Sequence, residues 1–164
     1  MTWLHVPPTL RRYTLERAIL ERTSEFLRRR GEEGLEATVA WLGRVVDETH
    51  AEIVDVYAPE QIGYASEDGV AVEVTQRGLA EMISALPEGV FVLARVHSHP
   101  SDAYHSPLDD ENMLISHEGA ISIVVPHFAR AGMELATCSI NELRHGQGWR
   151  ELAPDEVAER FTVT

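Results

Sequence analysis

Two histidines separated by one residue mark the part of the chain whose residue types could do chemistry. The stretch from residue 95 to residue 110 reads RVHSHPSDAYHSPLDD, so His97 and His99 follow the apolar segment 89–96. That segment is rich in valine, leucine and phenylalanine, which predicts a buried strand. Side chains two residues apart on a strand point to the same face. The two imidazoles are therefore expected to converge on one point.

A serine and two aspartates follow these histidines after a short loop. Ser106-Pro107 predicts a helix start, because serine is a preferred N-cap and proline fits the first helical position. Asp109 and Asp110 would lie in the first turn. Taken singly, these features are also typical of surface imidazoles and of an ordinary acidic helix start. Together, two histidines and one aspartate match a catalytic zinc site whose fourth position is left to water.

The strings HSHP and SPLD resemble the motif of the JAB/MPN/JAMM metalloproteases. The family pattern is a glutamate far upstream, then His-Ser/Thr-His-Pro, a spacer and Ser-x-x-Asp. The resemblance implies that His97 and His99 are zinc ligands, that Asp109 is the third ligand, and that Ser106 helps to hold the oxyanion.

The spacer in this motif departs from the family pattern. Residues 100–105 make it one residue shorter than usual. Asp110 therefore keeps the family's distance from His99, whereas Asp109 keeps the distance from Ser106. We prefer Asp109, because Ser106 and the helix that it caps should move together with the ligand.

The upstream glutamate of the motif is assigned to Glu36, in the segment GLEATVAWLGR. Its distance from Gly43 fits the family's Glu-(apolar run)-Leu-Gly pattern. The alternative is that Glu36 merely ends an acidic run before a buried strand. A water bound to zinc still needs a base that takes its proton and passes it to the leaving amine. A carboxylate at the edge of an apolar strand is in a setting that suits this role, because desolvation raises a carboxyl pKa.

The resemblance also implies a fold and an activity. The expected fold is α/β (α+β), a mixed central β-sheet flanked by helices of the MPN/JAB, cytidine-deaminase-like type, in a single domain over residues 1–164. The expected activity is zinc-dependent hydrolysis at the C-terminal tail of a ubiquitin-like or sulfur-carrier protein, with E1-like and E2-like proteins of the same pathway as further partners. Two alternatives stay open: a catalytically inactive MPN scaffold and a small-molecule zinc amidohydrolase.

Composition excludes several other classes of function. A chain of 164 residues with a net charge of −13 fits one globular domain and argues against nucleic acid or an anionic membrane as partner. No apolar run has the length of a membrane span and no signal peptide is evident, so we expect a cytoplasmic protein. The single Cys138 excludes an intramolecular disulfide and a cysteine-based zinc site; we expect it to be packed.

Hydrophobic periodicity predicts the elements that must position these residues. We expect a first helix from Thr14 as N-cap to about residue 30, a helix capped by Thr75, and a short helix from Pro154. Strands are expected at 35–42, 43–49, 50–57, 70–74, 89–96, 120–125, 133–143 and 149–152. The segment 59–68 is expected to be a loop that contacts the substrate, and the substrate tail is expected to add as a strand beside the histidine-bearing strand.

Overall fold

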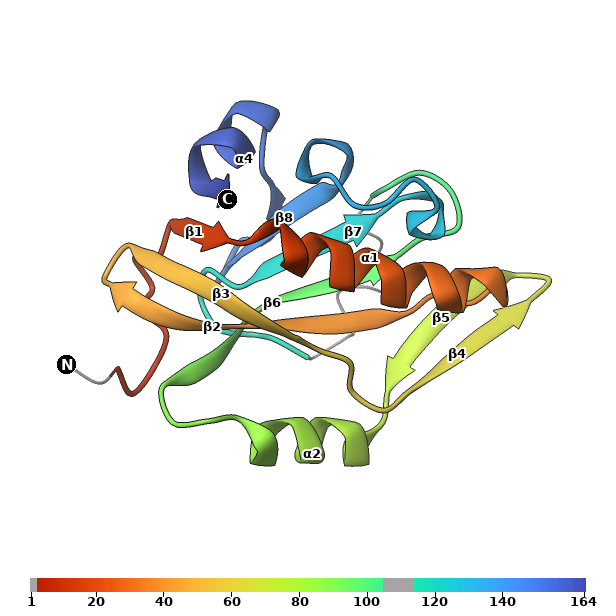
Figure 1. The fold of residues 1–164 in the computed structure, drawn as a ribbon, viewed down its shortest axis with the longest axis horizontal. Coiled ribbons are helices and arrows are strands. Elements are labelled where there is room, and N and C mark those ends of the chain that lie inside the picture. Colours follow the sequence, from red (N-terminus) through yellow and green to blue (C-terminus); the bar gives the residue numbers. More distant parts are fainter. Residues whose placement is uncertain (1–2, 105–113) are drawn as a thin grey trace.

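A computed structural model describes residues 3–104 and 114–164 of the chain. In this part of the chain, one mixed sheet has the strand order β10-β1-β3-β2-β6-β7-β8-β9 (Figure 1). Its strands are β1 (Arg12–Leu15), β2 (Thr38–Asp47), β3 (His50–Tyr57), β6 (Val90–Ser98), β7 (Ile121–Val125), β8 (Ser139–Arg144), β9 (Gly148–Glu151) and β10 (Phe161–Val163). A separate hairpin is formed by β4 (Gln61–Ser66) and β5 (Gly69–Val74). The expected mixed central sheet is confirmed.

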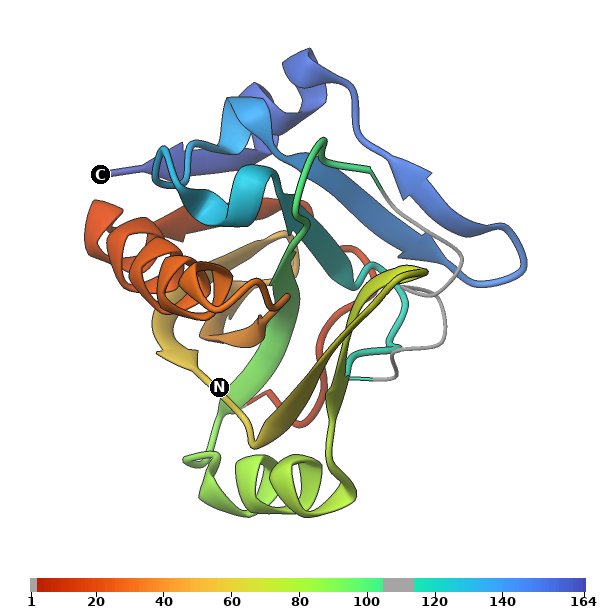
Figure 2. The same ribbon diagram turned by 90° about the vertical axis from the view of Figure 1, so that its right-hand side faces the viewer.

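Helices cover both faces of this sheet (Figure 2). They are α1 (Arg17–Glu32), α2 (Gln76–Ala85), α4 (Pro154–Arg160) and the short 3₁₀ turns η1 (His127–Ala129) and η2 (Leu135–Thr137). Successive residues of β2 point to opposite faces of the sheet. Val39 and Trp41 belong to the hydrophobic cluster that includes residues of α1, whereas Ala40 and Leu42 belong to the cluster that includes Met82 of α2. This alternation is the period of two that a sheet covered on both faces requires.

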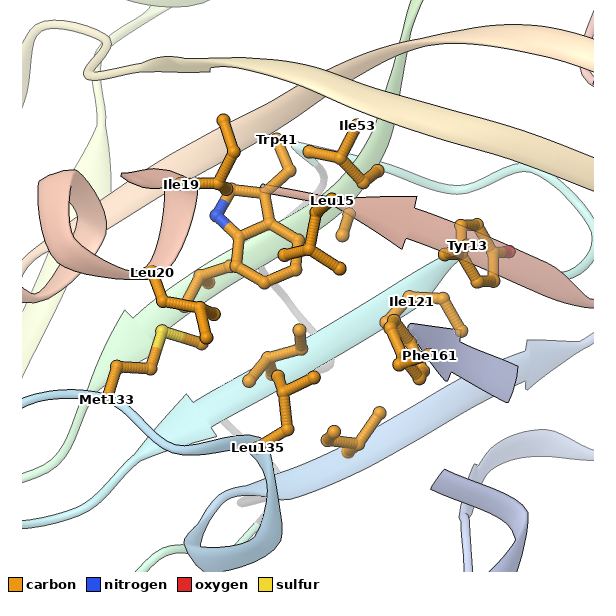
Figure 3. Close-up of a cluster of buried hydrophobic side chains, with 14 of the residues drawn as sticks. Tyr13, Leu15, Ile19, Leu20, Trp41, Ile53, Ile121, Met133, Leu135 and Phe161 are labelled. Carbon is orange, nitrogen blue, oxygen red and sulfur yellow. The ribbon is translucent and has the colours of Figure 1, made fainter. Parts of the chain in front are cut away.

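Trp41 is the centre of the larger core, on the α1 side of the sheet (Figure 3). Its side chain is fully buried, and its indole Nε1 donates a hydrogen bond of 2.9 Å to Thr23 Oγ1 on α1. Ile19 and Leu20 of α1 pack in the same cluster. Burial of each such aliphatic side chain stabilises the fold by about 1.5–3 kcal/mol. The hydrogen bond explains why Thr23 can lie on the buried face of the helix.

The start of the first helix differs from our prediction. Thr14 lies in β1 and does not cap a helix; α1 begins at Arg17, and Glu16 is its N-cap residue. The strand β1 pairs in parallel with β3 and with β10. Both partner strands are distant from β1 in sequence. This long-range pairing, and not the local N-cap pattern at Thr14, decides the structure of the segment.

The segment predicted as a loop at 59–68 contains β4. Ile62 and Tyr64 are alternate residues of this strand. At the turn into β5, Gly69 has a φ of 127°, a backbone conformation that favours glycine. The base of the hairpin is fixed to α2, because Thr75 N donates to the Glu60 carbonyl. A Cβ on Gly78 of α2 would lie 2.4 Å from that same carbonyl oxygen.

Other predictions of local structure are confirmed, with one shortening. Thr75 caps α2 through a hydrogen bond of 2.9 Å from Gly78 N, and β2 and β3 form the predicted hairpin. Pro154 opens α4. The strand predicted over 133–143 is shorter, because η2 occupies its first part and β8 begins only at Ser139.

A buried carboxylate ties α4 to the sheet. Glu142 of β8 has no exposed side-chain surface, and its Oε1 lies 2.8 Å from Arg144 Nη2 and 3.7 Å from Arg150 Nη2. Its other oxygen pairs with Arg160 of α4. Burial, and then the charge of Glu142, raises the pKa of Tyr13 well above its ordinary value. We refer to Glu142 and its three arginines as the arginine cluster.

Candidate metal centre

The two histidines of the motif lie together at the end of β6. His97 and His99 are each 4% exposed, and their Nε2 atoms are 3.3 Å apart. The ring centroids are separated by 5.1 Å, and the rings are tilted by 59°. The predicted convergence of the two imidazoles is therefore present in the structure.

The separation of the two Nε2 atoms fits a tetrahedral metal. Zinc binds imidazole nitrogen at about 2.0–2.1 Å, so two nitrogens of a tetrahedral site lie about 3.3–3.4 Å apart. The observed 3.3 Å equals that edge. Two neutral imidazoles with this spacing and this burial are suited to hold zinc, and the residues present fit the ion that the motif implies.

Backbone hydrogen bonds fix His99 beyond the end of β6. His99 N donates to the Val125 carbonyl at 2.9 Å, and the His99 carbonyl accepts from Phe128 N at 2.8 Å. The Tyr104 ring meets the His99 imidazole edge-on, with centroids 4.7 Å apart. His99 is therefore held by two backbone contacts and one ring contact, although it lies outside the strand.

The turn that holds His99 has an unusual backbone. His127, Phe128 and Ala129 have φ values of 55°, 52° and 57°, in the left-handed region. Such a conformation costs roughly 1–2 kcal/mol for each residue other than glycine. Phe128 packs on α1 where residue 31 is a glycine: a Cβ there would lie 2.3 Å from Phe128 Cβ. The close approach of η1 to α1 offsets the strain and keeps Phe128 N in place for His99.

Glu36 lies just before the end of β2 that pairs with His97. Thr38 of β2 and His97 of β6 are Cα partners, so their side chains share one face. The pairing continues one residue beyond β2, because Ser98 N donates to the Ala37 carbonyl at 3.1 Å. Glu36 is the next residue before Ala37, at the end of β2 where Thr38 pairs with His97. Glu36 itself precedes β2 and is half-buried; the expected strand at 35–42 begins only at Thr38.

Ser106, Asp109 and Asp110 lie outside the described residues. Within residues 3–104 and 114–164, no three His, Cys, Asp or Glu side chains gather as a metal-ligating group. The described structure thus brings together the two histidines. The third ligand and the oxyanion serine remain predictions.

Arg95 is a buried residue of this face that sequence analysis missed. It lies two residues before His97 on β6 and is 1% exposed. Its Nε donates to Ser122 Oγ at 2.9 Å, and its guanidinium lies 5.0 Å from the centroid of the Trp149 ring. Arg95 is therefore a buried cationic side chain of the histidine-bearing strand, held by a serine of β7 and a tryptophan of β9. The alternation of residues 95, 97 and 99 was the signal that could have revealed it.

Cys138 and the cavity beside it lie away from the histidines. This cavity of about 640 Å³ is bounded by α1, η2, α4 and β10, with Leu20, Leu135, Cys138, Val157 and Phe161 among its lining residues. Burial raises the pKa of the Cys138 thiol to about 12, so the thiolate needed for nucleophilic chemistry is not formed near neutral pH. The cavity is apolar, whereas the histidine pair lies on the opposite, α2-facing side of the sheet.

Comparison with known proteins decides the family. No protein-family model matches the chain. A protein of Sinorhizobium fredii named "Probable metalloprotease y4jG" is 31% identical over 156 residues, which cover 94% of this chain and 96% of that protein. The chain belongs to this metalloprotease family. A metal-dependent peptidase is consistent with two buried histidines whose nitrogens have the spacing of zinc ligands.

Structural comparison supports the fold of this metalloprotease. The solution structure of protein DSY2949 from Desulfitobacterium hafniense matches with a TM-score of 0.62, covering 93% of this chain and 92% of that chain. The sequence identity is 16%, so the likeness concerns the fold alone. Among the described residues, no helix has the length and apolar character needed to cross a bilayer.

Proposed function

We propose that this metalloprotease is a zinc-dependent peptidase of the JAMM type that cuts at the C-terminal tail of a ubiquitin-like or sulfur-carrier protein. The observation that carries the proposal is the pair of buried Nε2 atoms 3.3 Å apart. Glu36, two residues before Thr38 on the neighbouring chain segment, is the proposed base. His97, His99 and Asp109 would hold the ion. Proposed partners in the same pathway are E1-like and E2-like proteins, and the proposed location is the cytoplasm.

Each residue of the site has a distinct role in the proposed reaction. When bound, zinc supplies Lewis-acid chemistry, which makes a water molecule a nucleophile near neutral pH. Glu36 takes the proton of that water as general base and returns it to the leaving amine as general acid. Ser106 donates a hydrogen bond to the oxygen on which negative charge develops. His97 and His99 stay neutral throughout, which the rigid strand end and its buried surroundings favour.

The substrate tail needs a different docking edge from the one we predicted. β6 is bonded to β2 on one side and to β7 on the other up to Ser98, so an extended tail has no edge to join beside the histidines. The hairpin β4–β5 is better suited. Ile62 and Tyr64 on β4 are each 48% exposed, and the hairpin forms a sheet of only two strands among the described elements. We propose that the tail contacts this hairpin, in the segment expected from sequence to meet substrate.

The test is cleavage of a ubiquitin-like protein that carries a C-terminal extension, followed by intact mass. We expect release of the extension, inhibition by a chelator, and a fall of roughly 10²-fold or more in turnover for Glu36→Gln, the usual scale of acid–base catalysis. Glu33→Gln, an exposed acid on the same turn, is the matched control and should keep full activity.

Two results would contradict the proposal in different ways. Turnover of small amides without cleavage of any protein tail would indicate a small-molecule amidohydrolase. A zinc-loaded protein that cleaves neither class of substrate would indicate a binding scaffold.

A further inference from the structure

Gln61 takes the place of a missing strand at the edge of β2. The last pair between β2 and β3 is Ala40 with Tyr57, so β3 no longer accompanies β2 at Thr38. There the Gln61 side-chain amide forms both bonds that a neighbouring strand would form: Thr38 N donates to Gln61 Oε1 at 2.8 Å, and Gln61 Nε2 donates to the Thr38 carbonyl at 2.9 Å. The same Nε2 also donates to the Pro59 carbonyl at 2.8 Å, which fixes the amide itself.

Ser98 holds the opposite edge of the same dipeptide. Its hydroxyl accepts a hydrogen bond of 3.1 Å from Ala37 N, while its own N–H donates to the Ala37 carbonyl. Thr38 adds a third link to β6, because its Oγ1 donates to the Val96 carbonyl at 3.2 Å. Residues 37 and 38 are therefore bonded on both edges, although β2 has only just begun. Glu36 is the next residue upstream.

We propose that Gln61 is a positioning residue for Glu36. This inference rests on the proposed function, in which Glu36 is the base. A strand end bonded along only one edge would fray, and its last side chain would sample many positions. The Gln61 amide removes that freedom from the side of β2 that β3 leaves open. It thereby fixes the backbone from which the Glu36 carboxylate projects.

The same amide connects Glu36 to the hairpin. Gln61 is the first residue of β4, and a Cβ on Gly63, two residues along that strand, would lie only 3.1 Å from Leu35 Cβ. The hairpin thus touches the chain on both sides of Glu36, at Leu35 and at Thr38. Gln61 therefore anchors both the β4–β5 hairpin, which we propose contacts the substrate tail, and the chain next to Glu36, the proposed base.

The experiment compares Gln61→Met with Gln147→Met. The first keeps the length of the side chain and removes its hydrogen bonds, and the second makes the same change at an exposed turn. With the tail-extended substrate, we expect kcat of Gln61→Met to fall by about 10–100-fold, as happens when catalytic groups are slightly misplaced, with bound zinc within about twofold of the parent and with KM changing less than kcat. Gln147→Met should match the parent in all three.

Amide hydrogen exchange supplies a readout that does not depend on activity. Protection of the Thr38 amide should fall at least tenfold in Gln61→Met, while that of Trp41, in the middle of β2, stays unchanged. Gln61→Glu retains the acceptor for Thr38 N and loses the donor, so its kcat should lie between those of the parent and Gln61→Met. It also serves as the second variant if Gln61→Met does not fold.

The outcomes separate this inference from the proposed function. Unchanged protection of Thr38, or lost protection with an unchanged kcat, would overturn the positioning role. Glu36→Gln that retains full turnover would instead overturn the proposed function, whatever Gln61 does.

Discussion

Two buried polar groups lie on opposite faces of the sheet and are built in opposite ways. In the arginine cluster, the Glu142 carboxylate has no exposed surface and is surrounded by Arg144, Arg150 and Arg160. At the candidate metal centre, the imidazoles of His97 and His99 point their Nε2 atoms at a common place. The first group matches opposite charges directly, whereas the second brings together two groups of the same kind.

This difference separates a structural site from a functional one. A buried carboxylate beside guanidinium groups satisfies its own charge and fixes α4 against the sheet. Two imidazole nitrogens separated by the edge length of a zinc tetrahedron form part of a site that a metal cation would complete. The contrast predicts that changes at the arginine cluster act on stability, whereas changes at the histidines act on metal content and chemistry.

The largest expected effect is loss of metal from the histidine pair. The purified protein should hold about one zinc per chain, and His97→Ala combined with His99→Ala should remove nearly all of it, because two of three protein ligands are gone. Metal analysis by mass spectrometry measures this directly. His5→Ala, at an exposed histidine near the N-terminus, is the control and should keep the metal. Stoichiometric zinc in the double variant would show that the ion lies elsewhere.

The third ligand gives the next largest effect. Asp109→Ala should lose zinc and activity, whereas Asp110→Ala should keep most of both. The reason is that Ser106, the predicted N-cap, and Asp109, the predicted ligand, belong to the same predicted helix start. The shortened spacer at residues 100–105 should therefore shift both together. Metal content of the two variants decides the question, and the reverse pattern would assign the ligand to Asp110.

The arginine cluster should respond in stability and leave the zinc in place. Glu142→Gln leaves Arg160, whose side chain is only 11% exposed, without its carboxylate, so the unfolding free energy should fall by about 3–5 kcal/mol in a denaturant titration. Glu134→Gln is the control, because its ion pair with Arg17 is more than half exposed on both sides and contributes no more than about 1 kcal/mol. Equal losses for the two variants would contradict the structural role of the cluster.

The smallest effect concerns a buried histidine that has no role in the site. Burial, and then the charge of His145, lowers the pKa of His117 from 6.5 to about 4. Between these values the unfolded chain binds the extra proton, so stability falls as pH drops from 6.5 towards 4, by on the order of 2–3 kcal/mol. His117→Gln should flatten that part of the pH–stability curve. A variant curve parallel to that of the parent would show that His117 is not the group that titrates.

Local signals explain what the sequence could predict. The N-cap at Thr75, the β2–β3 hairpin and the apolar strand before His97 depend on neighbouring residues, and the structure has all three. The alternation of Ile62 and Tyr64 was an equally local signal for β4, but the surrounding Pro, Gly, Ser and Asp residues favoured a loop. Glu36 was identified by resemblance, and its role as the base stays a prediction.

Contacts between distant residues explain what the sequence could not predict. The bonds from Gln61 to Thr38 join two backbone groups to a side chain in another sheet, and no periodicity marks such a residue. Similarly, Arg95 is identifiable as buried only once Ser122 and Trp149 are placed beside it. The short β1 and β10 have too few residues for a hydrophobic pattern, and their pairing joins segments far apart in the chain.

The pairing of β1 with β10 sets an order for assembly during translation. Tyr13, Thr14 and Leu15 meet Phe161, Thr162 and Val163 in a parallel ladder, and the Tyr13 and Phe161 rings stack with centroids 5.1 Å apart. Both histidines and Glu36 leave the ribosome well before β10. On a nascent chain the apolar side of β1 therefore stays uncovered while β2 and β6 can already pair, and β10 then adds beside β1 at the edge of the sheet, separated from β6 by β1, β3 and β2.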